Sequence, residues 1–336
     1  MSKLRAGLVG LGMMGRHHAR VLSSLDGVDL VAVADTEGDR FGAVGGVPVL
    51  SSVDTLIEQG IDYCVVAVPT RFHLDVVLKL AEAGVHALVE KPLAHSSEAA
   101  SRLVDIYDAN GLIGGVGHIE RYNAALQEAR ARIEAGDLGD IHQVATRRQG
   151  PFPGRIADVG VVKDLGTHDF DLTAWVTQQS YKSVSAQTAF KSGREHEDLV
   201  TVVGRLSEGT VATHQVNWLS PFKERTTVIT GERGAFIADT LTADLTFYEN
   251  GEVATTWDNV SRFRGVSEGN VTRFAFAKPE PLVVEHEVFR DSLLGKTSSI
   301  VTFQQGAQTL AVAEACIESS VREETVTVPV IPAGQS

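Results

Sequence analysis

Two short segments of this sequence place polar side chains at spacings suited to acid–base chemistry. In Glu90-Lys91-Pro92 the lysine follows an apolar run, and its ammonium group can bond a hydroxyl and stabilise the negative charge of a developing alkoxide. In the second segment, Asp164 and His168 are four residues apart, so they share one face of a helix, as do His168 and Asp171. An imidazole suits proton removal from an alcohol near neutral pH, and neighbouring carboxylates orient its ring and raise its proton affinity.

Each segment also has a structural interpretation. Glu90 and Lys91 would then form an ordinary surface ion pair, and residues 164–171 would be the acid-rich start of a helix around a packed histidine. The spacing of Asp164 and His168 would also suit a metal ion, but no further set of His, Cys, Asp or Glu ligands stands out, and we predict no metal. The rest of the sequence has to decide between these interpretations.

A glycine-rich turn near the start of the chain provides the first context. An apolar strand at residues 6–9 runs into Gly10-Leu11-Gly12-Met13-Met14-Gly15; a helical segment and a second apolar strand at 30–34 follow, and Asp35 comes directly after them. This order of strand, glycine turn, helix and acidic residue is typical of a dinucleotide-binding site. A tight structural turn between a strand and a helix is the alternative.

The residue types of this turn match the shape of a dinucleotide. Gly10 permits the tight turn, Gly12 lets the backbone approach a pyrophosphate, and Gly15 lets the helix pack on the sheet, while the helix N-terminus offers N–H groups and a positive dipole to phosphates. Asp35 can accept hydrogen bonds from a ribose 2′-OH and repels a 2′-phosphate, so we predict NAD as the cofactor. Nearby Arg40 keeps NADP possible. The predicted contacts in this segment are Gly10, Gly12, Met13, Met14, Gly15 and Asp35.

The composition bounds the class of protein. A chain of 336 residues has room for about two domains, and 43% apolar with 22% charged residues is typical of a soluble globular protein. The net charge of −13 argues against nucleic-acid binding, and no apolar run approaches the ~18 residues of a membrane span. Cys64 and Cys316 lie far apart in apolar segments, as buried thiols of a reducing compartment would, so we expect a cytoplasmic protein.

The first 120 residues alternate between strand-like and helix-like segments. Strands are expected at 62–69, 86–90 and 112–116, and helices at 71–84 and 96–110. Such βαβ alternation predicts a doubly wound parallel sheet. Ligands bind beyond the carboxyl ends of the strands in such a sheet, and the glycine turn, residues 69–73 and residues 90–92 all lie at strand ends.

From about residue 140 the pattern changes to strands joined by short turns. We expect strands at 141–149, 184–190, 199–206, 210–218, 225–230 and 245–248, and helices at 123–135, 169–176, 284–294 and 303–319. Runs of adjacent strands imply a mainly antiparallel sheet, with the helices on one face. We therefore predict an α/β protein with a first domain of residues 1–120, a second α/β domain of residues 121–330 and a tail of residues 331–336.

By these residues the chain resembles the Gfo/Idh/MocA oxidoreductases, the glucose–fructose oxidoreductase and inositol dehydrogenase family. The resemblance rests on Gly10-x-Gly12-x-x-Gly15, Glu90-Lys91-Pro92 and Asp164-x-x-x-His168-x-x-Asp171, and it covers nearly the whole chain. It implies an N-terminal Rossmann domain and a C-terminal domain on a large open sheet whose exposed face serves oligomer contacts, so we expect a homo-oligomer, a dimer or a tetramer. It also implies a site between the domains, with Lys91, Asp164 and His168 as the catalytic group.

The resemblance adds further cofactor contacts. Pro69, Thr70 and His73 match the family's second cofactor-contacting segment, although Arg71 stands where an asparagine is common. The cofactor contacts expected around the catalytic lysine are Glu90, Lys91 and Pro92. The glycine-rich run that commonly precedes the catalytic aspartate is replaced here by residues 159–163, a departure that bears on the substrate side of the site.

The substrate class is indicated by two further segments. Residues 117–123 and 149–155, followed by 158–160, resemble the branch of the family that contains UDP-N-acetylglucosamine 3-dehydrogenases. Between residues 147 and 163, four basic residues stand against the single acid Asp158, and a basic patch suits an anionic sugar diphosphate or uronate. The alternative is that these side chains are solvated on an exposed strand and loop. The predicted substrate contacts are Lys91, His118, Arg121, Arg148, Arg155, Asp164 and His168, of which His118 has a structural role as its alternative.

The sequence thus supports the hypothesis of an NAD(P)-dependent dehydrogenase that transfers a hydride between nicotinamide and a secondary alcohol of a sugar or sugar derivative. His168 would take the hydroxyl proton, Lys91 would stabilise the oxygen, and Asp164 would position one of them; the roles of Lys91 and His168 are exchangeable. One alternative is an inositol or free-sugar dehydrogenase. Another is a non-catalytic regulator that senses the cofactor, which the retention of all three polar residues disfavours.

Overall fold

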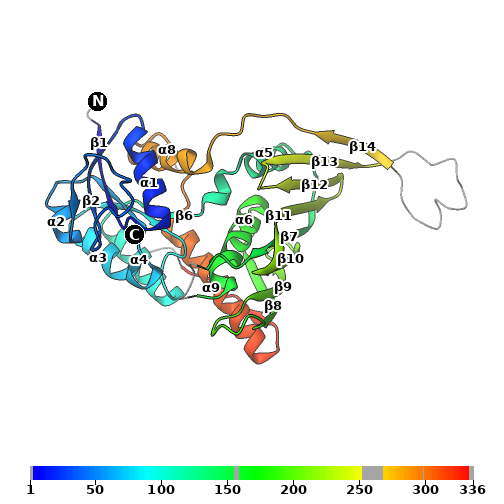
Figure 1. Cartoon of the computed structure of the whole chain (residues 1–336). Helices are drawn as coiled ribbons and strands as arrows, with labels where there is room; N and C mark the ends of the chain where they lie inside the picture. Colours follow the sequence, from blue (N-terminus) through cyan, green and yellow to red (C-terminus); the bar gives the residue numbers. More distant parts are fainter. Residues whose placement is uncertain (1–2, 155–158, 252–267, 298, 333–336) are drawn as a thin grey trace, which may run out of the picture. The chain divides into compact units, whose positions relative to one another are not determined.

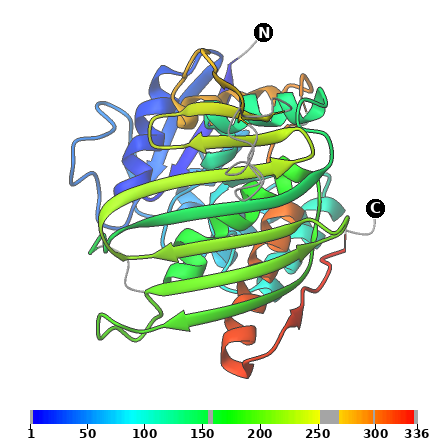
Figure 2. The same ribbon diagram turned by 90° about the vertical axis from the view of Figure 1, so that its right-hand side faces the viewer.

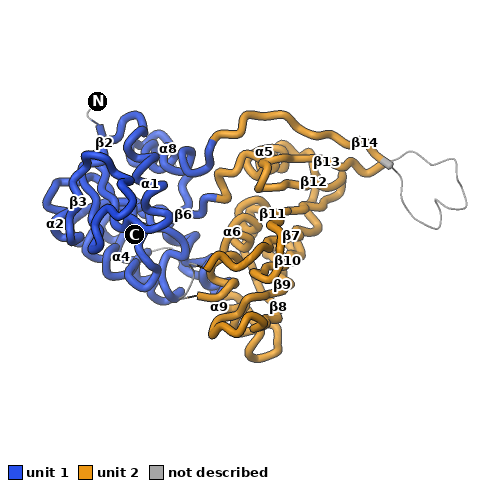
Figure 3. The backbone as a smooth tube through the Cα atoms, viewed as in Figure 1, with its two compact units in different colours: residues 1–119, 280–314, 329–336 blue, residues 120–279, 315–328 orange. Residues whose placement is uncertain are grey.

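The computed structural model describes residues 3–154, 159–251, 268–297 and 299–332, which form two compact units. Unit 1 contains residues 1–119, 280–314 and 329–336, and unit 2 contains residues 120–279 and 315–328 (Figure 3). The chain passes from unit 1 to unit 2 between residues 119 and 120, and residues 280–314 belong to unit 1 again. Among the described residues, no helix is both long and apolar enough to span a lipid bilayer.

Unit 1, which carries the labels β1, β2 and β6 in Figure 1, is built on a six-stranded parallel sheet. The order of its strands is β3-β2-β1-β4-β5-β6. Its strands are β1 (Leu4–Val9), β2 (Val28–Ala34), β3 (Val49–Leu50), β4 (Tyr63–Val66), β5 (His86–Glu90) and β6 (Gly114–Gly117). Its helices are α1 (Met13–Ser24), α2 (Val53–Ile57), α3 (His73–Glu82), α4 (Ser97–Ala109), α8 (Pro281–Leu293) and the first part of α9 (Phe303–Arg322). The strand order reverses between β1 and β4, and this is where doubly wound sheets bind ligands.

The sheet of unit 1 carries an apolar core on each face. Leu80 of α3 and Leu103 of α4 are in the core of one face, and Leu22 of α1 and Phe289 of α8 are in that of the other. All four residues of β4 are buried, as the continuous apolar run in the sequence predicts. This confirms the doubly wound parallel sheet.

Two glycines of β6 let aromatic rings pack directly on the sheet. A Cβ atom on Gly114 would lie 2.6 Å from the ring of Phe303, and one on Gly115 would lie 2.9 Å from the ring of Phe289. The C-terminal helices α8 and α9 therefore supply rings that close on the sheet of unit 1.

Unit 2 is built on a nine-stranded sheet with the order β14-β13-β12-β11-β7-β10-β9-β8-β15, shown face on in Figure 2. Its strands are β7 (Ile141–Pro151), β8 (Tyr181–Ala189), β9 (Leu199–Leu206), β10 (Val211–Asn217), β11 (Leu219–Gly231), β12 (Gly234–Asp239), β13 (Asp244–Asn250), β14 (Glu268–Arg273) and β15 (Val326–Thr327). All described neighbours are antiparallel except β7 and β10. The mainly antiparallel sheet is confirmed.

One face of this sheet is packed against helices. Leu126 of α5 (Ala124–Glu134) and Leu172 of α6 (Thr167–Thr177) share a core cluster with Ile229 and Phe236 of the sheet. Side chains along β9 alternate between buried and exposed, which is typical of an antiparallel sheet with one covered and one open face. Strand β13 ends at Asn250, and residues 252–267 lie outside those described.

Candidate active site and cofactor cleft

The glycine turn of unit 1 has three different geometric requirements. Gly10 has a φ of +95°, and a Cβ atom there would lie 2.7 Å from the Ala67 carbonyl oxygen. A Cβ on Gly15 would lie 1.9 Å from the carbonyl oxygen of Gly10, so this close approach of helix and strand excludes any side chain. Among the described residues, a Cβ on Gly12 would meet no atom within 4 Å, and no side chain caps the N-terminus of α1, which follows Gly12. An open backbone and uncapped N–H groups fit a pyrophosphate.

A cleft of about 820 Å³ lies beside this turn. It is lined by residues from the ends of β1, β2 and β4 and the start of α3, among them Gly10, Gly12, Asp35, Glu37, Pro69, Arg71 and Phe72. Of the predicted cofactor contacts, Gly10, Gly12, Asp35 and Pro69 therefore line it. The Arg71 guanidinium, which stands at the position noted above as commonly asparagine, lies 4.6 Å from the ring centre of Phe72.

Asp35 is held rigidly at the edge of this cleft. Its carboxylate accepts hydrogen bonds from the backbone N–H of Leu11 at 2.6 Å and of Glu37 at 2.8 Å. The side chain of Glu37 in turn forms an ion pair with Arg40 at 2.6 Å. Arg40 is therefore bound to a carboxylate, and a 2′-phosphate here would meet two acidic side chains, which fits NAD better than NADP.

The remaining predicted cofactor residues lie around the cleft without lining it. Met13 and Met14 begin α1, and Thr70 lies in a short 3₁₀ turn (Thr70–Phe72) before α3. His73 is buried, and its ring nitrogens lie 3.0 Å from the carbonyl oxygen of Pro92 and 2.9 Å from that of Val68. The imidazole therefore joins the segments that follow β4 and β5 and would affect the cofactor only indirectly.

Lys91 comes directly after β5, at the carboxyl end of the sheet of unit 1. It is half-buried, and its backbone N–H donates to Oε2 of Glu90 at 3.2 Å. His118 is buried just after β6, and β5 and β6 are neighbouring strands. These two predicted substrate contacts thus follow adjacent strands of the same sheet.

In unit 2, Asp164 and His168 lie on successive turns of one helical segment. Asp164 is in a π-helical turn (Val162–Gly166) that continues directly into α6, whose first turn carries His168. Turns of this kind occur preferentially at functional sites because they displace side chains from the regular helical positions. Asp164 is buried and His168 is half-buried.

Glu197 fixes the start of this turn and was not predicted. Its carboxylate accepts a hydrogen bond from the backbone N–H of Val162 at 3.1 Å, and its carbonyl oxygen accepts one from Val161 at 3.0 Å. A Cβ atom on Gly160 would lie 2.0 Å from this carboxylate. The packing of Glu197 therefore requires a glycine at position 160. In the sequence alone, the only sign of this contact is a glycine two residues before the turn.

Two predicted substrate arginines form buried ion pairs in unit 2. Arg121 donates two hydrogen bonds to Asp171, at 2.7 and 2.6 Å. Arg148 donates to Asp169 and to Glu120, each at 2.9 Å. Burial alone would lower the pKa of Arg148, but the two carboxylates raise it instead. The two acids that follow His168 in α6 are thus bound to guanidinium groups, which fixes the start of this helix.

The predicted substrate contact Arg155 and the neighbouring Asp158 lie outside the described residues. In the part of the chain that the structure describes, no group of three or more His, Cys, Asp or Glu side chains is arranged to hold a metal ion.

Glu285 of α8 is a buried acid in unit 1, and it supports a prediction about stability. Neither carboxyl oxygen has a hydrogen-bond partner among the described residues, and burial, followed by the charge of Glu90, raises its pKa far above the ordinary value. Its pKa is ordinary in the unfolded chain, so unfolding releases a proton and stability falls as the pH rises above that value. We expect Glu285→Gln to match wild type near pH 4.5 and to become increasingly more stable up to pH 8, by at most ~1.4 kcal/mol per pH unit. Urea denaturation across this pH range measures the difference in the free energy of unfolding between the two proteins. A difference that does not change with pH would contradict the prediction.

Comparison with known proteins identifies the same two parts. The family model described as "Oxidoreductase family, NAD-binding Rossmann fold" matches residues 4–118, and the "GFO/IDH/MocA C-terminal domain" matches residues 126–237. UDP-N-acetylglucosamine 3-dehydrogenase of Acidithiobacillus ferrooxidans is 32% identical over 215 residues, which are 63% of this chain and 66% of that protein. Inositol 2-dehydrogenase 4 of Saccharopolyspora erythraea is 31% identical over 228 residues, 64% of this chain and 67% of that protein.

The structural similarity extends over nearly the whole chain. The solved structure of the Acidithiobacillus ferrooxidans UDP-N-acetylglucosamine 3-dehydrogenase superposes with a TM-score of 0.83 and 26% identity, covering 95% of this chain and 98% of that one. The matches to both family domains and the cleft with its glycine turn and Asp35 agree with this similarity. The chain belongs to the GFO/IDH/MocA family of NAD-binding oxidoreductases.

Proposed function

We propose that this protein is an NAD-dependent dehydrogenase that oxidises a secondary alcohol of a sugar or sugar derivative, and that the substrate is a nucleotide sugar. The observation that carries the proposal is the position of Lys91, directly after β5 in the same unit and at the same sheet edge as the NAD-compatible cleft. The relative named UDP-N-acetylglucosamine 3-dehydrogenase supports a nucleotide sugar, and the relative named inositol 2-dehydrogenase supports the wider class of sugar-like alcohols.

The proposed mechanism assigns one task to each polar residue. His168 takes the hydroxyl proton, and Lys91 forms a hydrogen bond to the same oxygen and stabilises its negative charge. Asp164 sets the position and proton affinity of His168 or Lys91. The roles of His168 and Lys91 as base are exchangeable. When bound, the nicotinamide ring supplies the acceptor for the hydride that leaves the carbinol carbon, so the alcohol becomes a ketone.

An inositol or free sugar is the second candidate substrate. The structure favours it in one respect, because the guanidinium groups of Arg121 and Arg148 are already bound to carboxylates and add little to a positive field. A panel of nucleotide sugars, uronates and inositols, assayed for NADH formation with NADP⁺ in parallel, tests both candidates. If NAD binds tightly but no member of the panel is oxidised, the protein is a cofactor-sensing regulator instead.

Cofactor choice yields a direct prediction. We expect Asp35→Ser to lower kcat/KM for NAD⁺ by about 10- to 100-fold and to raise it for NADP⁺, because the carboxylate that would accept ribose hydroxyl bonds and repel a phosphate is lost. Asp29→Ser is the matched control, since Asp29 is exposed at the opposite end of the same strand β2. Steady-state kinetics with both cofactors provide the ratio. An unchanged ratio in Asp35→Ser would show that another residue selects the cofactor.

The open face of the unit 2 sheet supports a proposal about assembly. Val203 of β9 and Val271 of β14 are at least half exposed, and a shallow depression of about 300 Å³ on strands β7, β10 and β11 is lined by residues such as Arg147, Thr213 and Gln215. A homo-oligomer, a dimer or a tetramer, would cover these apolar side chains. Sedimentation at micromolar concentration tests this, and a monomer would refute it.

The cytoplasm is the proposed location.

A further inference from the structure

Two buried histidines connect helices α1 and α8 to the end of strand β5. His18 of α1 has its Nδ1 atom 2.8 Å from Nε2 of His286 on α8, and its Nε2 atom 2.9 Å from Oε1 of Glu90. His18 and His286 are each 1% exposed. We call Glu90, His18 and His286 the histidine chain; it brings together residues 268 positions apart in the sequence.

The charge of Glu90 sets which atom donates in its hydrogen bond with His18. Burial raises the pKa of Glu90, but the hydrogen bond from His18 and the charges of His18, Lys91 and His73 together outweigh it. The pKa is therefore lowered, and Glu90 is a carboxylate that only accepts. Nε2 of His18 therefore carries the proton and donates it. Burial, and then the nearby His18, lowers the pKa of His286 well below its usual value, so this ring is neutral. The contact between His18 Nδ1 and His286 Nε2 is a second hydrogen bond, in which one of the two nitrogens donates and the other accepts.

The histidine chain ends on the backbone of Lys91. Oε1 of Glu90 is held by His18, which leaves Oε2 to accept the backbone N–H of Lys91 at 3.2 Å. On the other side of Lys91, the carbonyl oxygen of Pro92 lies 3.0 Å from Nδ1 of His73. Both neighbours of Lys91 thus lie against buried imidazoles, from helices on different sides of the sheet.

We propose that His18 and His286 are positioning residues for Lys91: by fixing the carboxylate of Glu90, they fix the main chain that presents the Lys91 ammonium to the substrate. The inference rests on the proposed function, in which Lys91 acts on the reacting oxygen. Neither histidine contacts substrate in this scheme. A displacement of about 1 Å at a reacting group is enough to cost about 100-fold in rate.

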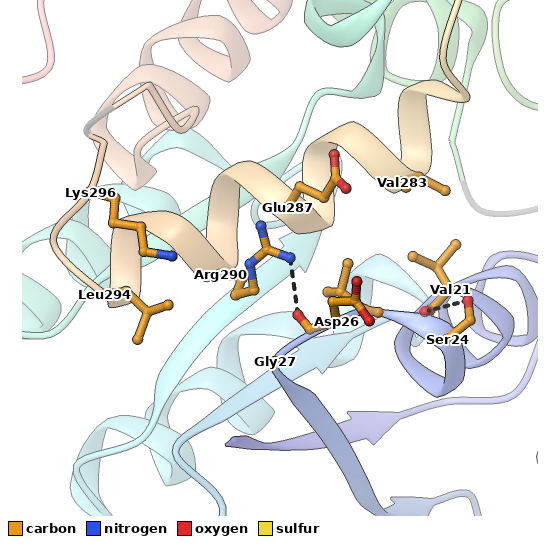
Figure 4. A pocket seen from close by; sticks show the side chains of 10 residues that line it. Val21, Ser24, Asp26, Gly27, Val283, Glu287, Arg290, Leu294 and Lys296 are labelled. Carbon is orange, nitrogen blue, oxygen red and sulfur yellow. Dashed lines mark hydrogen bonds between the residues drawn. The ribbon is translucent and has the colours of Figure 1, made fainter. Parts of the chain in front are cut away.

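Helix α8 is anchored independently of His286, which makes the histidine chain testable. Arg290 donates to the carbonyl oxygen of Asp26 at 3.0 Å, as Figure 4 shows beside a cavity of about 540 Å³ between the outer parts of α1 and α8. The ring of Phe289 packs on Tyr63, with 5.5 Å between ring centres. Replacing His286 therefore leaves the main contacts of the helix in place.

The experiment compares amide and apolar replacements of each histidine. The amide of glutamine lies near the position of Nε2, so His18→Gln retains the donor to Glu90 and is expected to keep kcat within about threefold of wild type. His18→Leu loses the donor, and kcat is expected to fall about 10- to 100-fold, with the dissociation constant for NADH changed less than about twofold. At position 286 we likewise expect kcat to be lower in His286→Leu than in His286→Gln, with smaller losses of kcat than at position 18. His17→Leu, an exposed neighbour on α1, is the control.

Two further measurements keep the outcome decisive. If His18→Leu does not fold, His18→Asn replaces it: its amide lies near Nδ1, so it faces His286 but not Glu90, and it is expected to lose kcat where His18→Gln does not. The ¹³C signal of reductively methylated Lys91, assigned with Lys91→Arg, reports the Lys91 environment without turnover. We expect this signal to shift in His18→Leu and to stay in His17→Leu. An unchanged signal together with unchanged kcat in His18→Leu overturns the inference. If the signal shifts in His18→Leu but the wild-type protein oxidises no alcohol, only the proposed function is overturned.

Discussion

Replacing Lys91 by alanine is expected to lower kcat by about a thousandfold with NAD⁺ and alcohol both saturating. The ammonium group would bond the oxygen whose negative charge develops as the hydride leaves, and groups of this kind contribute about 10²- to 10⁴-fold. Lys91 follows β5 and does not line the cleft that holds Gly12 and Asp35, so the dissociation constant for NADH should change by less than about threefold. Single-turnover kinetics and NADH fluorescence titration separate the two effects.

Two control variants sharpen this test. Lys91→Arg keeps the charge, but its planar guanidinium does not reproduce a compact ammonium group, so it should recover only a small part of kcat. Lys182→Ala removes an exposed lysine from β8 and should leave kcat unchanged. Near-wild-type turnover by Lys91→Ala with saturating substrate would refute the mechanism.

The fold could be predicted where the information is local. The all-buried β4 and the glycine turn after β1 are both visible as short patterns, because strand burial and a tight turn depend on neighbouring residues. Strand β12 (Gly234–Asp239) is not predicted, since its six residues begin at the glycine of a turn and show no regular alternation of apolar and polar side chains. The parallel pairing of β7 with β10 inside an otherwise antiparallel sheet depends on contacts distant in sequence and has no local signature.

The candidate site divides in the same way. Gly10, Gly12 and Asp35 are predictable because their chemistry and spacing are fixed within one βαβ unit. Glu197 and His18 are not, because their partners are 35 and 72 residues away and each looks like an ordinary polar residue. Sequence alone can thus name the groups that face a ligand more readily than the groups that hold them.

Arg148 shows why a count of charges along the chain misleads. The basic patch predicted from residues 147–163 treats Arg147 and Arg148 alike, yet successive residues of a strand point to opposite faces. In β7 the side chain of Arg147 is exposed, and its Nη1 lies 3.4 Å from Oε1 of Glu224. The side chain of Arg148 is instead buried between Asp169 and Glu120. The structure therefore favours a role for Arg148 in holding α6, although substrate binding remains a prediction.

Replacing Arg148 by methionine is accordingly expected to lower the free energy of unfolding by about 3–5 kcal/mol. Methionine fills a similar volume but leaves Asp169 and Glu120 buried without their cation, and removing one partner of a buried ion pair has costs of this size. Burial already raises the pKa of Asp169, so the loss of Arg148 will drive this carboxyl further toward its protonated form. Urea denaturation followed by circular dichroism measures the change.

Arg147→Met is the matched control, because it alters the adjacent residue of the same strand on the exposed face. Exposed ion pairs contribute about 0–1 kcal/mol, so this variant should stay close to wild type in stability. The two roles considered for Arg148 then separate cleanly in a single pair of variants. A structural role predicts a large loss of stability in Arg148→Met alone, whereas a substrate contact predicts a raised KM for an anionic sugar at nearly unchanged stability. The second pattern would show that Arg148 leaves its carboxylate partners to bind substrate.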